Sequence, residues 1–164
     1  MTARLPECLF VFTGGQPAVI AGLEQRLRGQ GATNVRLTGM LPDPQETRFY
    51  QKAADVLVSY YSSEDHPYAY QQLPAKVAEY MASGNAIVAA DYPAVRELLN
   101  SGNSWLVAPH EEAALVDAIE LAVNSGGDSA ARGARAQEDI GDRTSESVAA
   151  ELVAFLSALQ GAAR

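Results

Sequence analysis

The chain has 164 residues, 48% of them hydrophobic and 20% charged, which is enough for one globular domain with a buried core. The formal net charge of −8 argues against nucleic acid or an anionic membrane surface as the main partner, although amides at a helix start can still bind a phosphate. Cys8 is the only cysteine, which excludes an internal disulfide and a cysteine-based metal cluster. With no apolar run long enough for a secretory signal or a membrane span, we expect a soluble, cytoplasmic protein.

Short apolar runs alternate along the chain with segments of helical period. The runs that predict strands cover residues 8–15, 34–40, 55–61, 86–90 and 104–109. The segments that predict helices cover residues 17–31, 43–54, 74–83, 93–102 and 111–125, and a last helix carries Val148, Leu152, Phe155 and Leu159 on one face. The first of these helices repeats Val19, Leu23 and Leu27 at spacings of four. Residues 62–73 form the longest irregular loop, and the mixed-sign run 131–143 predicts a solvated helix face.

Apolar runs that are each followed by a helix are typical of a parallel sheet covered on both faces. With right-handed crossovers, the pattern predicts an α/β fold, a doubly wound and mostly parallel Rossmann-like sheet with helices on both faces. We expect one domain over residues 1–164. Ligands of such sheets bind beyond the carboxyl ends of the strands, here at loops 13–16, 62–73 and 91–94.

The helix that begins at Pro74 faces this edge of the sheet. Its first backbone N–H groups have no acceptor within the helix and can bind an anion. Lys76 and Glu79 lie three residues apart and share a helix face. They can form an ordinary surface pair. Because a long irregular loop precedes them, the alternative is a functional carboxylate that accepts two hydrogen bonds from a ribose diol.

Gly14 and Gly15 follow the first expected strand, but the remaining glycines of a dinucleotide fingerprint are absent. They are typical either of a tight turn or of a close backbone approach to a ligand. His66, in the long loop, is a candidate polar contact in the same cleft. Neither His66 nor His110 has metal-ligand partners at a suitable spacing, and no nucleophile elbow occurs.

The segment 53–109 resembles a known family. Its motifs "AADVLVSYY" and "LPAKVAEYMASGNAIVAADYPAVRELLNSGNSWLVAP" are similar to the C-terminal, donor-binding half of retaining glycosyltransferases of the GT-B architecture, the group 1 family. The similarity extends from about Leu9 to Val123. It implies a nucleotide-activated sugar as ligand, bound without a cofactor or a dedicated metal.

The resemblance implies roles for individual residues. Glu79 matches the family glutamate that holds the ribose hydroxyls, in a helix of the lysine-containing form that places Lys76 beside it. The backbone segment that faces the diphosphate corresponds to Gln72, Leu73, Pro74 and Ala75. Gly39 matches a glycine beside the base, and Gly14 and Gly15 match the glycines after the first strand on the nucleotide side.

The sequence departs from the family pattern in two places. The first glutamate of the family pair is replaced by Gln71, whose amide can bond a sugar hydroxyl but offers no negative charge to an oxocarbenium-like centre. The strand and helix that precede residues 9–15 in the family, and its acceptor-binding N-terminal domain, have no counterpart here. We therefore expect a sheet edge or cleft that is filled by another chain or repaired by rearrangement.

These observations lead to the hypothesis of a glycosyltransferase donor-binding domain. Completed by an acceptor-binding half or another chain, it would transfer a sugar, a hexose by resemblance, from a nucleoside diphosphate with retention, whereas alone it would turn over poorly. The alternative is a non-catalytic nucleotide-binding or self-assembling remnant of the fold, with a homodimer built on the uncovered edge.

Overall fold

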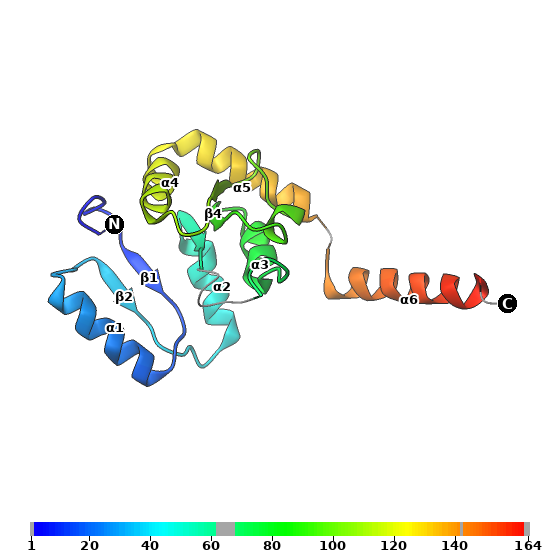
Figure 1. Ribbon diagram of the computed structural model, residues 1–164, viewed down its shortest axis with the longest axis horizontal. Helices are drawn as coiled ribbons and strands as arrows, with labels where there is room; N and C mark the ends of the chain where they lie inside the picture. The colour runs from blue at the N-terminus through cyan, green and yellow to red at the C-terminus, as the bar shows by residue number, and fades with distance from the viewer. Residues whose placement is uncertain (1, 62–67, 142, 163–164) are drawn as a thin grey trace.

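The computed structural model describes residues 2–61, 68–141 and 143–162, and it shows strands alternating with helices (Figure 1). The strands are β1 (Phe10–Phe12), β2 (Val35–Leu37), β3 (Val56–Ser59), β4 (Ala86–Ala90) and β5 (Trp105–Val107). The helices are α1 (Pro17–Gly29), α2 (Pro44–Ala53), α3 (Ala75–Ser83), α4 (Glu112–Asn124), α5 (Gly126–Ile140) and α6 (Ser145–Ala162), with a short 3-10 turn, η1 (Val95–Glu97). The predicted α/β fold class is confirmed.

The strands form two separate parallel sheets. β1 pairs with β2, and β3, β4 and β5 pair in that order. Between β1 and β3 the structure gives no pairing, so each of these strands has an open edge. Three side chains on these strands are also exposed, Val11 at 38%, Phe12 at 47% and Val58 at 37%. These open edges agree with the expectation of an uncovered sheet edge.

The core lies on both faces of β4, whose five residues are all buried. Ile87 and Ala89 face one cluster, which includes Val77 and Met81 of α3. Ala86 and Val88 face a second cluster beneath α4, because successive side chains of a strand point to opposite faces. Helices therefore cover both faces of this sheet, as the sequence predicts.

The N-terminal segment connects the two sheets. Leu5 is buried in the cluster beneath α4. The Asn34 side-chain amide donates to the carbonyl oxygens of Leu5 and Cys8, both at 2.9 Å. Arg4 pairs with Asp117 of α4 at 2.7 Å. A turn, rather than a strand, thus lies between β1 and the body of the domain.

The helix expected over residues 93–102 is wrong, because only η1 forms there. Asparagine side chains take the hydrogen bonds that would continue the helix. The Asn103 side chain donates to the Leu98 carbonyl at 3.1 Å and accepts from the Asn100 amide at 2.8 Å. The Gly102 amide, the helical partner of that carbonyl, donates instead to Asn100 Oδ1 at 2.8 Å.

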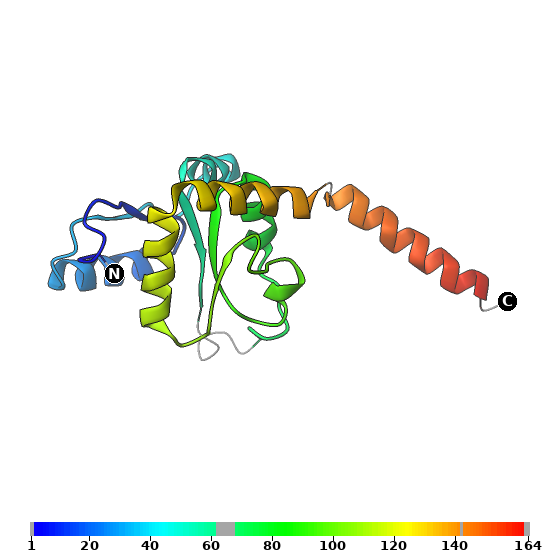
Figure 2. The same ribbon diagram turned by 90° about the horizontal axis from the view of Figure 1, so that it is seen from above.

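Helix α5 runs across one end of the strands of the larger sheet (Figure 2). Contrary to the expectation of a solvated face, it buries Gly133, Ala136 and Ile140. Gly133 lies so close to the chain before β4 that an added Cβ would stand 2.3 Å from the Gly84 carbonyl oxygen. Because Gly84 and Asn85 precede β4, α5 covers the amino ends of the strands and leaves the carboxyl ends to the loops.

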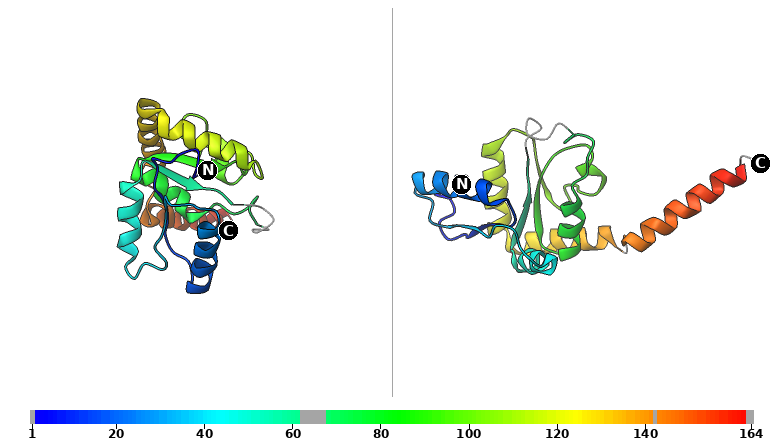
Figure 3. Two further views of the ribbon diagram at one scale, coloured as in Figure 1. Left: turned by 90° about the vertical axis from the view of Figure 1, so that its left-hand side faces the viewer. Right: turned by 90° about the horizontal axis from the view of Figure 1, so that it is seen from below.

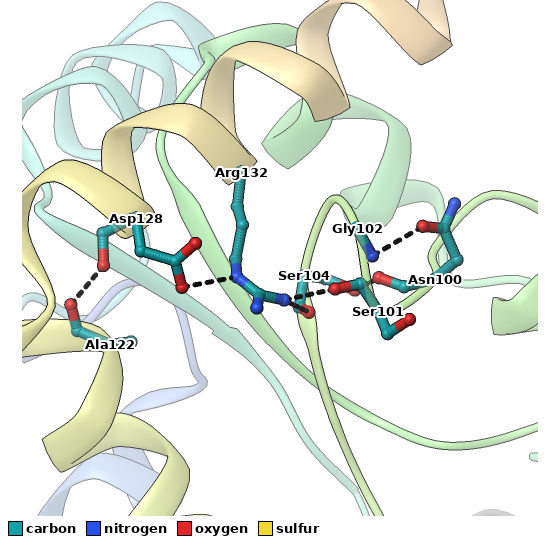
Figure 4. A network of polar contacts seen from close by, with 8 residues as sticks. Asn100, Ser101, Gly102, Ser104, Ala122, Asp128 and Arg132 are labelled. Carbon is teal, nitrogen blue, oxygen red and sulfur yellow. Dashed lines mark hydrogen bonds and ion pairs between the residues drawn. The ribbon is translucent and has the colours of Figure 1, made fainter.

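Arg132 of α5 holds the turn before β5 (Figure 4). Its guanidinium lies 4.5 Å above the Trp105 ring centre, a cation–π contact. It also donates to the carbonyl oxygens of Ser101 and, at 2.9 Å, Ser104, while Asp128 accepts from its Nε at 2.9 Å. The network fixes the entry of the chain into β5.

Helix α6 projects away from the rest of the domain (Figures 1 and 2). The predicted helix is confirmed, and the apolar positions of its expected face are exposed, among them Leu152 at 56% and Phe155 at 60%. In the part of the chain that the structure describes, no helix combines the length and apolar character needed to cross a membrane.

Candidate functional site

At the carboxyl ends of β1 and β2, two glycine loops meet. The Gly14 amide donates to the Gly39 carbonyl at 2.8 Å, and Thr38 Oγ1 donates to the same carbonyl at 2.8 Å. Gly14 and Gly39 have φ of 88° and 67°, and Gly15 has φ of 101°, a left-handed region that disfavours other residues. An added Cβ at Gly14 or Gly39 would meet no heavy atom within 4 Å. The structure therefore brings Gly14 and Gly39 together with open space beside their backbone, whereas a Cβ at Gly15 would lie 2.9 Å from Ile20 Cδ1.

The start of α3 is the second part of the candidate site. Pro74 is its N-cap, with extended backbone at φ −65° and ψ 127°, and no side chain caps this end. Ala75 and Lys76 are exposed, whereas Pro74 and Leu73 are half-buried. The helix thus begins with an accessible amide end, which favours an anion.

The segment that leads into α3 is a compact turn. The Gln71 and Gln72 amides both donate to the Tyr68 carbonyl, at 3.0 and 2.8 Å, and both glutamines are exposed. Ala69, at 2% exposure, anchors the turn in the core. His66 lies outside the described residues.

Glu79 lies in the contact between α2 and α3. Its Oε2 accepts a hydrogen bond from Gln51 Nε2 at 2.8 Å, although the residue as a whole is exposed. Among the ion pairs of residues 2–61, 68–141 and 143–162, none joins Lys76 to Glu79. Burial raises the pKa of the neighbouring Tyr80, and the Glu79 charge raises it further. The carboxylate is oriented through one oxygen, and the other, Oε1, has no partner in the described part of the chain.

The contact between α2 and α3 is fixed at its far end. Lys52 Nζ donates to the Ser83 carbonyl at 2.7 Å, and Asn85 Nδ2 donates to the Gln51 carbonyl at 2.7 Å. The helix that carries Gln51 is therefore held against the helix that carries Glu79. Sequence analysis did not single out Gln51, because a glutamine in an amphipathic helix gives no local signal of a tertiary partner.

An aromatic group supports the loops after β3 and β4. Tyr92, fully buried, stacks on Tyr61 with ring centres 5.2 Å apart and meets Tyr70 edge-on, also at 5.2 Å. The Tyr92 hydroxyl donates to the Tyr61 carbonyl at 3.1 Å. These contacts join the turn before α3 to the 91–94 loop.

The loop after β4 carries an ion pair. Arg96 donates from Nε and Nη2 to the two carboxylate oxygens of Asp91, at 2.5 and 2.6 Å. These hydrogen bonds hold the pKa of Asp91 below its ordinary value. Since both charges are occupied within the loop, we assign neither to a ligand.

The predicted site residues thus form two groups, one on each sheet. Gly14, Gly15 and Gly39 belong to the β1–β2 unit, and residues 71–79 belong to the larger body (Figures 1 and 3). Two surface hollows lie elsewhere. One adjoins Leu98 and Arg143, and the other adjoins Trp105 and Arg132.

Residues 2–125 match the family described as "Glycosyl transferases group 1". Among solved structures, HepE from Anabaena in complex with UDP-glucose has a TM-score of 0.76 and 21% identity; the match covers 95% of this chain and 43% of that chain. A trehalose 6-phosphate synthase from Burkholderia multivorans has a TM-score of 0.78 and 16% identity, covering 99% of this chain and 39% of that chain. The C-terminal domain of LpcC, a group 1 protein from Francisella tularensis, has a TM-score of 0.65 and 13% identity, covering 85% of this chain and 89% of that domain. No curated protein matches the chain.

Proposed function

Because the chain belongs to the group 1 glycosyltransferases, we propose that it is the donor-binding domain of an enzyme of this family. Completed by an acceptor-binding half, it transfers a sugar, a hexose by resemblance, from a nucleoside diphosphate to an acceptor with retention. The observation that carries this proposal is the start of α3. An uncapped helix end lies at the carboxyl edge of the sheet, and the oriented carboxylate of Glu79 follows about one turn inside the helix.

Each group of the site has a part in this proposal. The backbone amides of the exposed residues Ala75 and Lys76, with the Lys76 ammonium, hold the diphosphate, whose charge the helix end stabilises. Glu79 accepts from the ribose hydroxyls through the oxygen that Gln51 leaves available. The backbone at Gly14, Gly15 and Gly39 approaches the nucleoside.

Gln71 is the predicted residue nearest the sugar end of the donor, where its exposed side-chain amide can bond a sugar hydroxyl. The backbone of Gln72, Leu73 and Pro74, in the turn before α3, faces the diphosphate together with Ala75. His66, outside the described residues, stays a predicted polar contact, and no dedicated metal or cofactor is part of the proposal.

A partner half is part of the proposal because this chain offers few cations. Its net charge is −8, so the chain as a whole repels a diphosphate at long range. The start of α3 and Lys76 are the groups that attract it. The open edges of β1 and β3 and the exposed Val11 and Phe12 supply a surface that another chain or half can cover. The chain also spans only 43% of the HepE chain that it matches. We place this activity in the cytoplasm.

The same open edges favour a second candidate function, a non-catalytic remnant that self-assembles. Gln71 stands where the family has a glutamate, and a homodimer could cover β1 and β3. This alternative predicts a stable dimer in light scattering and no change of melting temperature with nucleotide. The donor-binding domain predicts a melting temperature that rises with UDP or GDP, because a ligand that binds the folded state stabilises it.

Calorimetric titration of UDP, GDP and UDP-glucose tests the proposal. We expect binding by the wild type and at least about tenfold weaker binding by Glu79→Ala, since hydrogen bonds to a carboxylate contribute about 1.5–3 kcal/mol. Glu151→Ala, on the projecting α6, is the matched control and should bind as the wild type does. Absence of binding to the wild type at millimolar ligand would remove the proposal for the isolated chain.

A further inference from the structure

The end of β3 carries two hydroxyl groups without hydrogen-bond partners. Ser59 is 1% exposed, and neither its Oγ nor the hydroxyl of the next residue, Tyr60, has a partner in the part of the chain that the structure describes. A buried polar group without a partner is costly, and such groups often mark functional positions. Two of them in sequence at the end of β3, an edge strand of the larger sheet, require an explanation.

Other buried hydroxyls of the same core are satisfied. Ser83 Oγ donates to the Tyr80 carbonyl at 2.6 Å and accepts from the Asn85 amide at 3.3 Å. Ser104 Oγ donates to the Asn100 carbonyl at 2.9 Å. The core around β4 thus provides acceptors where a hydroxyl is purely structural, which sets Ser59 and Tyr60 apart.

The strand register fixes the side to which Ser59 points. Ser59 pairs with Ala89, and Ala89 lies in the cluster that contains Val77 and Met81 of α3. Paired residues of neighbouring strands share a face, so the Ser59 hydroxyl lies on the α3 face. It is also at the carboxyl end of β3, the same edge at which the uncapped start of α3 stands.

Tyr60 extends this group at the strand end. Tyr60, the residue directly after the strand, is half-buried and packs against both core clusters. Phenolic and aliphatic hydroxyls can each donate one hydrogen bond without bringing charge. A phosphoryl oxygen at the α3 amide end is an acceptor that suits both.

We propose that Ser59 and Tyr60 are further binding residues for the donor, and that their hydroxyls donate to the diphosphate held at the start of α3. This inference rests on the proposed function and deepens it. It places part of the diphosphate-binding site at the end of β3, in addition to the start of α3. Without ligand, burying these hydroxyls without hydrogen-bond partners lowers the stability of the folded protein.

The variants Ser59→Ala and Tyr60→Phe each remove one hydroxyl. They test the inference because the nucleotide affinity should fall while the melting temperature stays the same or rises. Without ligand, each variant should melt at the wild-type temperature or higher, because a polar group without a partner is removed. Each should bind both UDP and UDP-glucose about tenfold more weakly, since each loses a hydrogen bond to a charged group. Ser83→Ala, which removes a partnered hydroxyl from α3, should do the reverse, melting lower and keeping the nucleotide affinity.

Four results would overturn the inference. Unchanged affinity of both variants for UDP, with binding intact in the wild type, removes it and leaves the proposed function standing. Melting temperatures that fall as in Ser83→Ala show that the hydroxyls are structural. A loss confined to UDP-glucose moves the contact from the diphosphate to the sugar. Absence of UDP binding by the wild type removes the proposed function together with the inference.

Discussion

The β1–β2 unit and the body built on β4 follow the same alternation of strand and helix, yet they are packed very differently. In the body, α3 buries Val77 and Met81 completely. In the β1–β2 unit, α1 has no buried residue, and Val19 on its apolar stripe is 62% exposed. Both helices repeat apolar residues at helical spacing, but only α3 packs against a core that buries them.

Strand position explains this difference. β4 has a paired strand on each side and a helix layer on each face, whereas β1 has one neighbour and an open edge. Parallel strands are stable when both faces and edges are covered. The β1–β2 unit is instead attached through Phe10, which packs against the cluster beneath α4, and through polar links such as the Asn34 contacts to Leu5 and Cys8.

The contrast bears on the proposed site, whose groups lie on both units. A donor that reaches Gly14 and Gly39 from the start of α3 would contact the well-packed body and the weakly packed unit at once. Binding would then stabilise the β1–β2 unit more than the body, because linkage acts most visibly on the region that opens first.

The largest expected effect comes from two methionines, one in each setting. Met81 is fully buried in α3, and Met40, beyond β2, is 72% exposed. Truncation of a buried methionine leaves a cavity, so we expect Met81→Ala to lower the free energy of unfolding by about 2–5 kcal/mol. Met40→Ala should change it by less than about 0.5 kcal/mol. Urea unfolding followed by circular dichroism measures both, and similar losses would contradict the contrast between the two regions.

The next effect concerns the contact between α5 and the chain before β4. A Cβ on Gly133 would lie 2.3 Å from the Gly84 carbonyl oxygen, a backbone atom that cannot rotate away. We expect Gly133→Ala to cost about 1–3 kcal/mol of unfolding free energy, with larger residues costing more. Gly127→Ala is the control in the same helix, because nothing lies within 4 Å of its Cβ position. It should be neutral or slightly stabilising, and an equal loss in both variants would exclude close packing as the cause.

Sequence patterns predicted the body better than its connections. The run 86–90 gives β4, and a helix forms beyond Pro74, because apolar content and a proline start act locally. The expected helix at 93–102 failed, since Asn103 takes the Leu98 carbonyl that a helix would use. The burial of α5 was missed because Gly133 and Ala136 are too small to produce an apolar stripe, and their close approach depends on tertiary structure.

The sequence could suggest candidate site residues but not their arrangement. The glycines after the first strand and a carboxylate behind a helix start can be read from spacing, whereas Gly39 entered only through the family resemblance. The bond from Gln51 to Glu79 and the pairing of Gly14 with Gly39 join segments distant in the chain, so no local pattern could reveal them. The unpartnered hydroxyls of Ser59 and Tyr60 depend on what surrounds them, and that became visible only with the packing.

The smallest expected effect concerns Asn34 and sharpens the comparison most. Its side-chain amide donates to the carbonyl oxygens of Leu5 and Cys8 at 2.9 Å each. Its backbone carbonyl accepts from the Phe10 backbone amide at 2.9 Å. We expect Asn34→Ala to cost about 1–2 kcal/mol, because the side-chain donors are lost while the backbone bond remains. Asn34→Asp keeps the shape without the donors and should lose at least as much.

The location of the Asn34→Ala loss is the informative measurement. Amide hydrogen exchange should accelerate in β1 and β2, whose packing depends on these links, while β4 keeps its protection, since a sub-global opening can occur without unfolding the core. Asn124→Ala, at the exposed end of α4, should leave both regions unchanged. Faster exchange in β4 to the same degree would mean that the two units unfold as one, and that the open edges between them do not divide the domain energetically.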